Sequence, residues 1–211
     1  MDSARTPASQ AEAANSIRLP PPRLDSEFAL ERALRERRSV RAFGRAALTQ
    51  TEVGQLLWAG QGVTAPDGLR TAPSAGALFP LELYVVVGSV ENLDPGIYRY
   101  GPQPHRLARI AAGDVRADLA RAALGQDFVA RAAAVLVFAA VEERTTRKYG
   151  KRGVRYVHIE VGHAAQNVFL QATALGLDAV VVGAFNDRMV QRALNLPEGE
   201  APLYLMPVGR H

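Results

Sequence analysis

Hydrophobic residues along this chain fall into two patterns, which predict strands in some segments and helices in others. Unbroken apolar or β-branched runs of strand length, bounded by Pro, Gly or charge, are typical of strands buried in a sheet. Apolar residues spaced three or four positions apart are typical of helices with one buried face. Strands are expected at Leu81–Val87, Ile97–Tyr100, Leu107–Ile110, Ala133–Val141, Ala179–Val182 and Leu203–Val208.

Capping residues indicate where the predicted helices begin and end. Thr49 and Glu52 form a capping box, since the hydroxyl can accept from the third amide while the carboxylate reaches back. Gly176 follows the longest stretch of helical spacing and ends it. Helices are expected from Asp25 or Ser26 to about Arg37, over Thr49–Gly60, from Asp114 through Leu124, over Tyr156–Leu175 and from about Asn186.

The size and composition of the chain indicate one globular domain. It has 211 residues, of which 48% are hydrophobic and 22% are charged, and this is enough apolar surface for a single core. Residues 1–24 are rich in Ala and Ser and close with a proline run, so we expect a flexible N-terminal arm followed by a domain over residues 25–211. The absence of cysteine excludes thiol nucleophiles, disulfides and thiolate metal sites.

The sequence predicts neither a membrane segment nor a secretory signal. The longest strongly apolar stretch, Ala132–Val141, is about half of the ~20 residues that span a bilayer. Residues 1–24 contain charged residues and no continuous apolar stretch. We therefore expect no membrane partner and a cytoplasmic location.

A basic stretch offers the first candidate chemistry. The formal net charge is +4 and the isoelectric point is about 9.7, which suggests an anionic partner such as nucleic acid, a membrane surface or a phosphate-bearing cofactor. The alternative is a solvated basic face, because further arginines lie nearby. Nucleic acid is not expected, since interleaved aromatic residues and a helix-turn-helix or zinc signature are lacking. The phosphate-sized set of donors comprises Arg37, Arg38, Ser39 and Arg41.

A loop of small residues immediately precedes a predicted buried strand. Its first members are Pro73, Ser74, Ala75 and Gly76. Without bulky side chains, the backbone amides and the Ser74 hydroxyl can hydrogen-bond the edge of a flat ligand, while the prolines hold the shape of the loop. The alternative is a tight connection between a helix and a strand.

His158, Glu160 and His163 raise a metal hypothesis, because the Glu-x-x-His spacing places two ligands on one helical face. Di-iron bundles need two such motifs and further carboxylates on other helices, and none is evident. We therefore expect no metal, and we interpret His158 and Glu160 as packing or interface residues. A Gly-x-Gly-x-x-Gly motif after a strand is also lacking, so a resident dinucleotide is not expected.

Four motifs, taken in their order and spacing, resemble the SagB-type dehydrogenases, or azoline oxidases, of the nitroreductase-like superfamily. They are Arg-Arg-Ser-x-Arg-x-Phe, Pro-Ser-Ala-Gly-Ala-Leu-Phe-Pro, Lys-Tyr-Gly followed by Arg-Tyr-Val-His-Ile-Glu, and Val-Val-Gly-Ala-Phe. The resemblance runs from about Leu24 to the C-terminus. It implies an α+β nitroreductase-like fold, with a mixed, mainly antiparallel sheet flanked by helices, in a domain-interlocked homodimer that binds FMN at each of two subunit interfaces.

The same resemblance implies which residues bind FMN. One segment would hold the phosphate and ribityl chain, a loop would reach the isoalloxazine ring from the partner subunit, and a late segment would lie near the reactive nitrogen, where an amide donor stabilises the charge of the reduced flavin. Apart from the resemblance, Gln126 before a predicted strand is a further candidate for the flavin pocket, and the alternative is a polar residue that ends a helix. The matching positions are Arg37, Arg38, Ser39 and Arg41 for the phosphate and ribityl chain, Pro73, Ser74, Ala75 and Gly76 for the ring, Val182, Gly183 and Ala184 for the late segment, and Arg210 for the phosphate.

Lys148 and Tyr149 match a Lys-Tyr pair that azoline oxidases use near the substrate. Oxidation of an azoline to an azole removes a hydride and a proton from neighbouring atoms, so a base beside the flavin is required. A lysine that acts as a base must be neutral, which needs a desolvated or cation-rich setting. The alternative is an exposed basic loop. The neighbouring cations are Arg144, Arg147, Lys151 and Arg152.

Three functions are open at this point. The first is FMN-dependent oxidation of azoline heterocycles in peptides to azoles, by hydride transfer to the flavin. The second is NAD(P)H-dependent reduction of nitroaromatics or quinones, with NAD(P)H as a transient co-substrate. The third, from another class, is a non-enzymatic basic binding or scaffold protein. In the first two the partner is a small-molecule or modified-peptide substrate.

Overall fold

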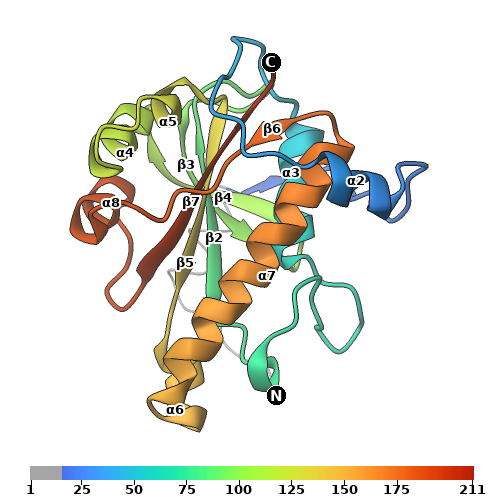
Figure 1. The fold of residues 1–211 in the computed structure, drawn as a ribbon. Coiled ribbons are helices and arrows are strands. Elements are labelled where there is room, and N and C mark those ends of the chain that lie inside the picture. Colours follow the sequence, from blue (N-terminus) through green and yellow to red (C-terminus); the bar gives the residue numbers. More distant parts are fainter. Residues whose placement is uncertain (1–15) are drawn as a thin grey trace.

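The structure is a computed structural model that describes residues 16–211. Its centre is a seven-stranded sheet with the order β1-β4-β3-β2-β5-β7-β6, in which all neighbouring strands are antiparallel (Figure 1). This confirms the α+β fold and the mainly antiparallel sheet that the resemblance implies. The strands are β1 (Ser16–Arg18), β2 (Leu81–Val87), β3 (Gly96–Gly101), β4 (Arg106–Ala112), β5 (Ala134–Ala140), β6 (Asp178–Ala179) and β7 (Ala201–Gly209).

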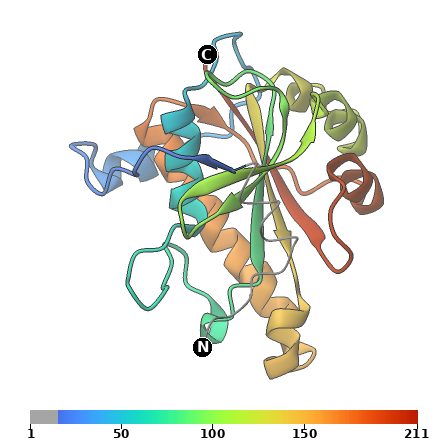
Figure 2. The same ribbon diagram turned by 180° about the vertical axis from the view of Figure 1, so that it is seen from behind.

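Helices cover both faces of the sheet. The two long helices α3 and α7 lie across one face, and α4, α5 and α8 lie on the other (Figures 1 and 2). Helix α2 packs on α7, and α6 lies beside the beginning of α7. The helices are α2 (Leu30–Glu36), α3 (Gln50–Gln61), α4 (Arg116–Ala122), α5 (Phe128–Arg131), α6 (Glu143–Tyr149), α7 (Arg152–Ala174) and α8 (Asp187–Leu194), with a 3₁₀ turn, η1, at Ala75–Ala77.

Alternation of side chains along β2 builds two apolar cores. Leu83 and Val85 belong to the core beneath α3 and α7, whereas Tyr84 and Val86 belong to the core beneath α4, α5 and α8. All four side chains are at most 2% exposed. Because the central strands are covered on both faces, they are unbroken apolar runs rather than alternating polar and apolar sequences.

Several predicted elements are confirmed to within a residue or two. The predicted strand Leu81–Val87 is β2. Thr49 caps α3 in a complete capping box, in which the Glu52 amide donates to the Thr49 hydroxyl at 3.2 Å and the Thr49 amide donates to the Glu52 carboxylate at 2.8 Å. Asn186 caps α8, and its side chain accepts from the Met189 amide at 3.0 Å.

Two boundaries differ from the prediction, and two short helices were not predicted. The first helix begins at Leu30 rather than at Asp25 or Ser26, because the Ser26 hydroxyl accepts from the Phe28 amide at 3.1 Å in a local turn. Of the predicted strand Ala179–Val182, only Ala179 belongs to β6, and Val182 adds an isolated bridge to Leu205. Helices α5 and α6, with four and seven residues, are too short to give a periodic signal.

The folded part also begins earlier than the sequence predicts. Ser16–Arg18 pair with β4 as strand β1, and the buried Leu19 donates its amide to the His105 carbonyl oxygen at 3.2 Å. The predicted arm over residues 1–24 is therefore too long, because the proline run follows the first strand instead of preceding the fold. The rest of that prediction, residues 1–15, lies outside the described residues.

Candidate functional site

The predicted phosphate-binding stretch runs along one edge of the sheet. The Val40 amide donates to the Ala179 carbonyl oxygen at 3.0 Å, and Ser39 lies beside Ala179 in a parallel bridge. These contacts hold the backbone between α2 and α3 against β6. The edge of the sheet therefore fixes where the neighbouring arginine side chains begin.

Three guanidinium groups on this stretch have no acidic partner within residues 16–211. The Arg37 guanidinium lies 5.2 Å from the centre of the Phe169 ring, and the Arg41 guanidinium lies 5.9 Å from that of Phe128. Arg38 donates only to two backbone carbonyl oxygens, each at 2.8 Å. No ion pair joins any of the three to a described carboxylate. Their charges are available to an anion, as binding of a phosphate requires.

The late segment Val182, Gly183 and Ala184 follows β6 and so lies at the same edge. Val182 exchanges two backbone hydrogen bonds with Leu205 of β7, at 2.7 and 3.0 Å. Gly183 and Ala184 are exposed, and the Gln126 side chain donates to the Ala184 carbonyl oxygen at 3.3 Å. The structure thus brings Gln126 and the late segment together, next to the element that holds the basic stretch.

Arg210 differs from the other predicted phosphate ligands because it already has a partner. Its guanidinium donates to the Glu52 carboxylate at 2.5 Å and to the Ala47 carbonyl oxygen at 3.3 Å. Glu52 is the capping-box residue of α3, so Arg210 joins the C-terminus to the start of that helix. The side chain is engaged in the fold rather than free to bind an anion.

The loop after Ala72 has an unusual backbone. Gly76 adopts φ +64°, and two residues with side chains are also left-handed, Ala77 at +52° and Phe79 at +45°. Residues other than glycine rarely adopt this conformation, which persists where the surroundings impose it. The Ser74 hydroxyl accepts from the Phe79 amide at 2.9 Å and so closes the loop on itself. This bond uses the hydroxyl oxygen as an acceptor and leaves its hydrogen available to another partner.

Lys148 and Tyr149 lie directly against this loop. A Cβ added to Gly76 would come within 2.8 Å of the Tyr149 hydroxyl oxygen and 3.0 Å of the Lys148 Nζ. Both residues belong to the last turn of α6, and the Tyr149 ring packs edge-on against Tyr156 of α7, with 5.1 Å between ring centres. The pair is thus held by a helix rather than by the exposed basic loop that was the alternative. The sequence missed α6 but identified both residues.

The cations expected around Lys148 are partly neutralised. Arg144 pairs with Glu82 at 2.6 Å, and Arg147 pairs with Glu143 at 3.0 Å. The excess of positive charge around Lys148 is therefore smaller than the sequence suggests.

Glu160, which the sequence indicates as a packing or interface residue, is buried beside the loop. It is 2% exposed on the sheet-facing side of α7, and its Oε1 atom has no hydrogen-bond partner among the described residues. Burial raises the pKa of the Glu160 carboxyl to about 7, although a hydrogen bond with the Ser74 side chain and the charge of Arg70 both act to lower this pKa. The signal in the sequence was a carboxylate on the apolar stripe of a helix, three residues after Val157 and four before Ala164.

His158 and His163 do not complete a metal site with Glu160. Among residues 16–211, no group of three or more His, Asp or Glu side chains lies close enough to hold a metal ion. In the same residues, no helix is long and apolar enough to cross a membrane.

Within one chain the predicted residues form two patches along α7. Arg37 contacts Phe169, whereas the loop contacts Glu160, nine positions earlier on the helix. At a rise of about 1.5 Å per residue, these contacts are about 14 Å apart. The basic stretch and the late segment make up one patch, and the loop with the Lys-Tyr pair makes up the other.

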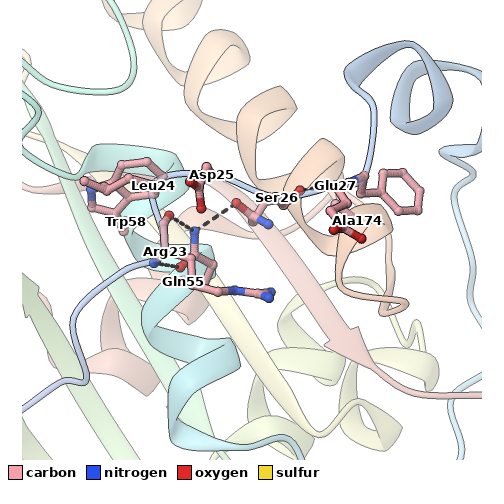
Figure 3. Close-up of a pocket in the computed structure, with 10 residues that line it drawn as sticks. Arg23, Leu24, Asp25, Ser26, Glu27, Gln55, Trp58 and Ala174 are labelled. Carbon is pink, nitrogen blue, oxygen red and sulfur yellow. Dashed lines mark hydrogen bonds between the residues drawn. The ribbon is translucent and has the colours of Figure 1, made fainter.

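Two neighbouring cavities lie beside α2, α3 and the end of α7. One of about 610 Å³ lies between the segment before α2, helix α3 and the end of α7 (Figure 3). Gln55 lines this cavity, and its side-chain oxygen accepts from the Arg23 amide at 2.8 Å. Its side-chain nitrogen donates to the Arg23 carbonyl oxygen at 3.0 Å and to the Gln171 side-chain oxygen at 3.1 Å. A neighbouring cavity of about 300 Å³ continues along α2 and α7. Leu24, Leu30 and Leu34 are 80%, 59% and 55% exposed in the segment that leads into α2 and in α2 itself.

The chain is similar in sequence to a family model and to known proteins. A model of the nitroreductase family matches residues 34–210. The nitroreductase-family protein MJ1384 of Methanocaldococcus jannaschii is 52% identical over 184 residues, which are 87% of this chain and 92% of that protein. The microcin B17-processing protein McbC of Escherichia coli is 31% identical over 147 residues, which are 66% of this chain and 54% of that protein.

Solved structures give the same assignment. A nitroreductase-family structure from Ralstonia eutropha JMP134 has a TM-score of 0.82 at 33% identity and covers 93% of this chain and 89% of its own. The Escherichia coli microcin synthetase McbBCD complex with truncated pro-MccB17 has a TM-score of 0.71 at 26% identity, covering 100% of this chain and 84% of the matched one. The non-enzymatic alternative is set aside, because family model, relatives and fold agree: the chain belongs to the nitroreductase family and is an oxidoreductase.

Proposed function

We propose that this oxidoreductase depends on FMN and is of the SagB type, oxidising azoline heterocycles in a peptide to azoles. The observation that supports this most directly is the contact of Lys148 and Tyr149 with Gly76. A proton-accepting pair beside the loop that is expected to reach the flavin ring is what removal of a hydride and a proton requires.

The residues present suit FMN. The free guanidinium groups of Arg37, Arg38 and Arg41 match a phosphate dianion, and the exposed backbone of Gly183 and Ala184 can lie against a flat ring. When bound, FMN would accept a hydride from one substrate and give electrons to another. Arg210 stays outside this set, because Glu52 already neutralises it.

A second copy of the chain would bring the two patches together. In the proposed homodimer, the loop and Lys-Tyr pair of one subunit approach the basic stretch and late segment of its partner. The exposed leucines of the region around α2, together with the adjoining cavities, form an apolar surface that such a partner could cover.

The proposed reaction gives each member of the Lys-Tyr pair a task. A neutral Lys148 Nζ would take the proton from the ring carbon of the azoline as the hydride leaves the neighbouring atom. The Tyr149 hydroxyl, fixed by the Tyr156 ring, would orient the heterocycle. The similarity to McbC, which processes microcin B17, supports a peptide substrate.

A second candidate is reduction of nitroaromatics or quinones with NAD(P)H as the transient electron donor. It is favoured by the 52% identity to MJ1384, a protein that is named as a nitroreductase. In this version the Lys-Tyr pair would contribute little, since no carbon acid is deprotonated.

The cofactor can be tested directly. We expect purified protein to release FMN, identified by mass and visible spectrum, and the Arg37→Ala/Arg41→Ala variant to lose it. The matched control is Arg32→Ala/Arg35→Ala, which removes two arginines that pair with Glu36 on α2 and should retain FMN. Wild-type protein that is colourless and cannot be reconstituted with FMN would contradict the proposal.

The reaction can be tested by Lys148→Ala with FMN retained. Azoline oxidation predicts loss of turnover on an azoline-bearing peptide, while Lys151→Ala, next to the start of α7 and exposed, keeps its turnover. Near-normal NAD(P)H-dependent reduction of a nitroaromatic by Lys148→Ala, with no azoline oxidation by wild type, would favour the second candidate.

A further inference from the structure

The loop against the Lys-Tyr pair has a backbone that its residue types do not favour. Ala77 and Phe79 are left-handed without being glycine, and such conformations persist where contacts impose them. The 3₁₀ turn at Ala75–Ala77 has no side-chain cap of its own. Something packed beneath the loop must therefore select this form.

A short chain of hydrogen bonds supplies that support. The Phe79 amide donates to the Ser74 Oγ at 2.9 Å, which leaves the hydroxyl hydrogen of Ser74 free to donate. Ser74 and Glu160 line the same cavity of about 280 Å³, so the buried carboxyl lies beside this hydroxyl and can accept its hydrogen. The two ends of the strained segment are thus connected to one buried carboxyl on α7.

We propose that Glu160 is a positioning residue, which acts through Ser74 to hold residues 74–79 in the form that receives the flavin ring. The flavin in this inference comes from the proposed function, and in that respect the inference rests on it. The support that Glu160 gives to the loop does not depend on the proposed function. Helix α7 fixes Glu160 rigidly, since Val157, Val161 and Ala164 around it are buried in the core. The loop therefore takes its shape from the long helix rather than from its own sequence.

The charged and titratable groups around this carboxyl determine what its charge would do. Arg70 approaches from the segment before the loop, but its guanidinium already donates to the Gln61 side chain at 2.6 Å and stacks on Phe79 at 4.5 Å. Tyr156 and His163, on α7 itself, line the same cavity of about 280 Å³, and Lys148 and Tyr149 lie across Gly76 on α6.

No ion pair to a described cation neutralises Glu160. When it ionises, a net negative charge lies behind the loop. Such a charge disfavours the additional electrons of a reduced flavin on the other side of that loop, since a like charge nearby raises the energy of the charged form. The midpoint potential of the bound flavin should then fall as Glu160 loses its proton.

The experiment compares four proteins: wild type, Glu160→Gln, Glu160→Ala and Ser74→Ala. Two measurements are made on each, the amide hydrogen exchange of Phe79 without cofactor and the affinity for FMN. We expect Glu160→Ala and Ser74→Ala to exchange the Phe79 amide faster and to bind FMN about tenfold more weakly or worse, since each removes a buried hydrogen bond. Glu160→Gln should stay close to wild type in both, because its amide oxygen still accepts from Ser74.

The midpoint potential of bound FMN supplies a readout that a purely structural role would not change. At about pH 8.5 we expect Glu160→Gln to have a more positive potential than wild type, and at about pH 5 the two should agree. Glu143→Gln, on α6, removes the same charge at a solvent-exposed position, where water screens it, and should match wild type at both pH values.

The outcomes distinguish a failure of the inference about Glu160 from a failure of the proposed function. Unchanged Phe79 exchange in Glu160→Ala and Ser74→Ala would overturn the inference, whatever the protein binds. Faster Phe79 exchange in the two variants than in wild type, together with no FMN binding by any of the proteins, would contradict the proposed function alone and would leave Glu160 as the support of the loop. An FMN potential that is equal in wild type and Glu160→Gln at every pH would contradict the electrostatic part.

Discussion

The Arg144 guanidinium donates to the Phe79 carbonyl oxygen at 3.0 Å, so the residue that ends the strained loop is tied to α6. The same side chain pairs with Glu82 on β2 at 2.6 Å. Arg144 lies one helical turn before Lys148. The sequence suggested only that Arg144 adds positive charge near the lysine, whereas the structure makes it the connection between the helix, the loop and the sheet.

Loss of this connection should reduce turnover more than it reduces stability. We expect Arg144→Ala to keep FMN and to lose about tenfold or more in turnover, because Lys148 and Tyr149 are no longer fixed against Gly76. The free energy of unfolding should fall by only about 1 kcal/mol, since the Arg144 side chain is partly exposed. Urea unfolding and steady-state kinetics on the same samples measure both effects.

Arg147→Ala is the matched control, because it lies on the same helix and its pair with Glu143 is exposed to solvent. It should change the free energy of unfolding by less than about 0.5 kcal/mol and leave turnover intact. Equal losses in the two variants would show that α6 tolerates any loss of charge poorly and that the contact with Phe79 has no special role.

Gly76→Ala should lower the unfolding free energy by more than the strain of its left-handed backbone alone would cause. At φ +64° the added Cβ is strained, and it would also lie 2.8 Å from the Tyr149 hydroxyl oxygen. Gly68 separates the two effects, because it has φ +86° and nothing within 4 Å of an added Cβ. We expect Gly68→Ala to cost about 1 kcal/mol in unfolding free energy and Gly76→Ala to cost more and to abolish turnover. Equal costs with activity retained would show that Tyr149 moves aside freely.

The pKa of Glu160 predicts how stability depends on pH. The folded protein holds this proton up to about pH 7, above the ordinary value of 4.5, so between these values the folded state binds more protons than the unfolded state. Stability should therefore fall as the pH rises through this window. Glu160→Gln should match wild type below about pH 4.5 and be more stable above about pH 7, by up to roughly 3 kcal/mol. Chemical unfolding at several pH values measures this, and a stability difference that is independent of pH would contradict it.

Loss of the Arg210 side chain should lower stability and spare FMN binding, whereas loss of the Arg41 side chain should weaken FMN binding and spare stability. Arg210→Ala breaks the pair with Glu52 and leaves a partly buried carboxylate at the capping box of α3, so we expect a loss of about 1–2 kcal/mol in unfolding free energy with FMN retained. Arg41→Ala removes an unpaired guanidinium and should lose FMN affinity with little change in stability. Weaker FMN binding in Arg210→Ala at unchanged stability would return Arg210 to the set of phosphate ligands.

Much of the fold could be predicted because its signals are local. The central strands are covered on both faces and are therefore continuous apolar runs, and the start of α3 is determined by the Thr49–Glu52 capping box within four residues. The start of the first helix could not be predicted, because a serine side chain can equally close a local turn, as Ser26 does, or cap a helix. Helix α6 has seven residues and one buried side chain, so it has almost no apolar pattern to detect.

The sequence predicted which segments form the candidate site, but it did not predict which residues of these segments contact one another. The resemblance identified the loop and the Lys-Tyr pair, and the structure brings them together at Gly76. Whether Arg210 is free or paired with Glu52, and which way the Ser74 hydroxyl points, depends on partners far away in the chain. Glu160 did carry a signal, since a carboxylate on an apolar helical stripe needs a partner, but only the fold identifies that partner as Ser74.

The two outermost strands of the sheet are its shortest, with three residues in β1 and two in β6. Strands this short offer few unpaired backbone groups to another chain, whereas β4, which β1 covers, has seven residues. A fragment that begins at Asp25, where the sequence alone placed the start of the domain, would leave β4 as an open edge. Such a fragment should aggregate by adding strands from neighbouring molecules, so the few residues of β1 protect the solubility of the whole fold.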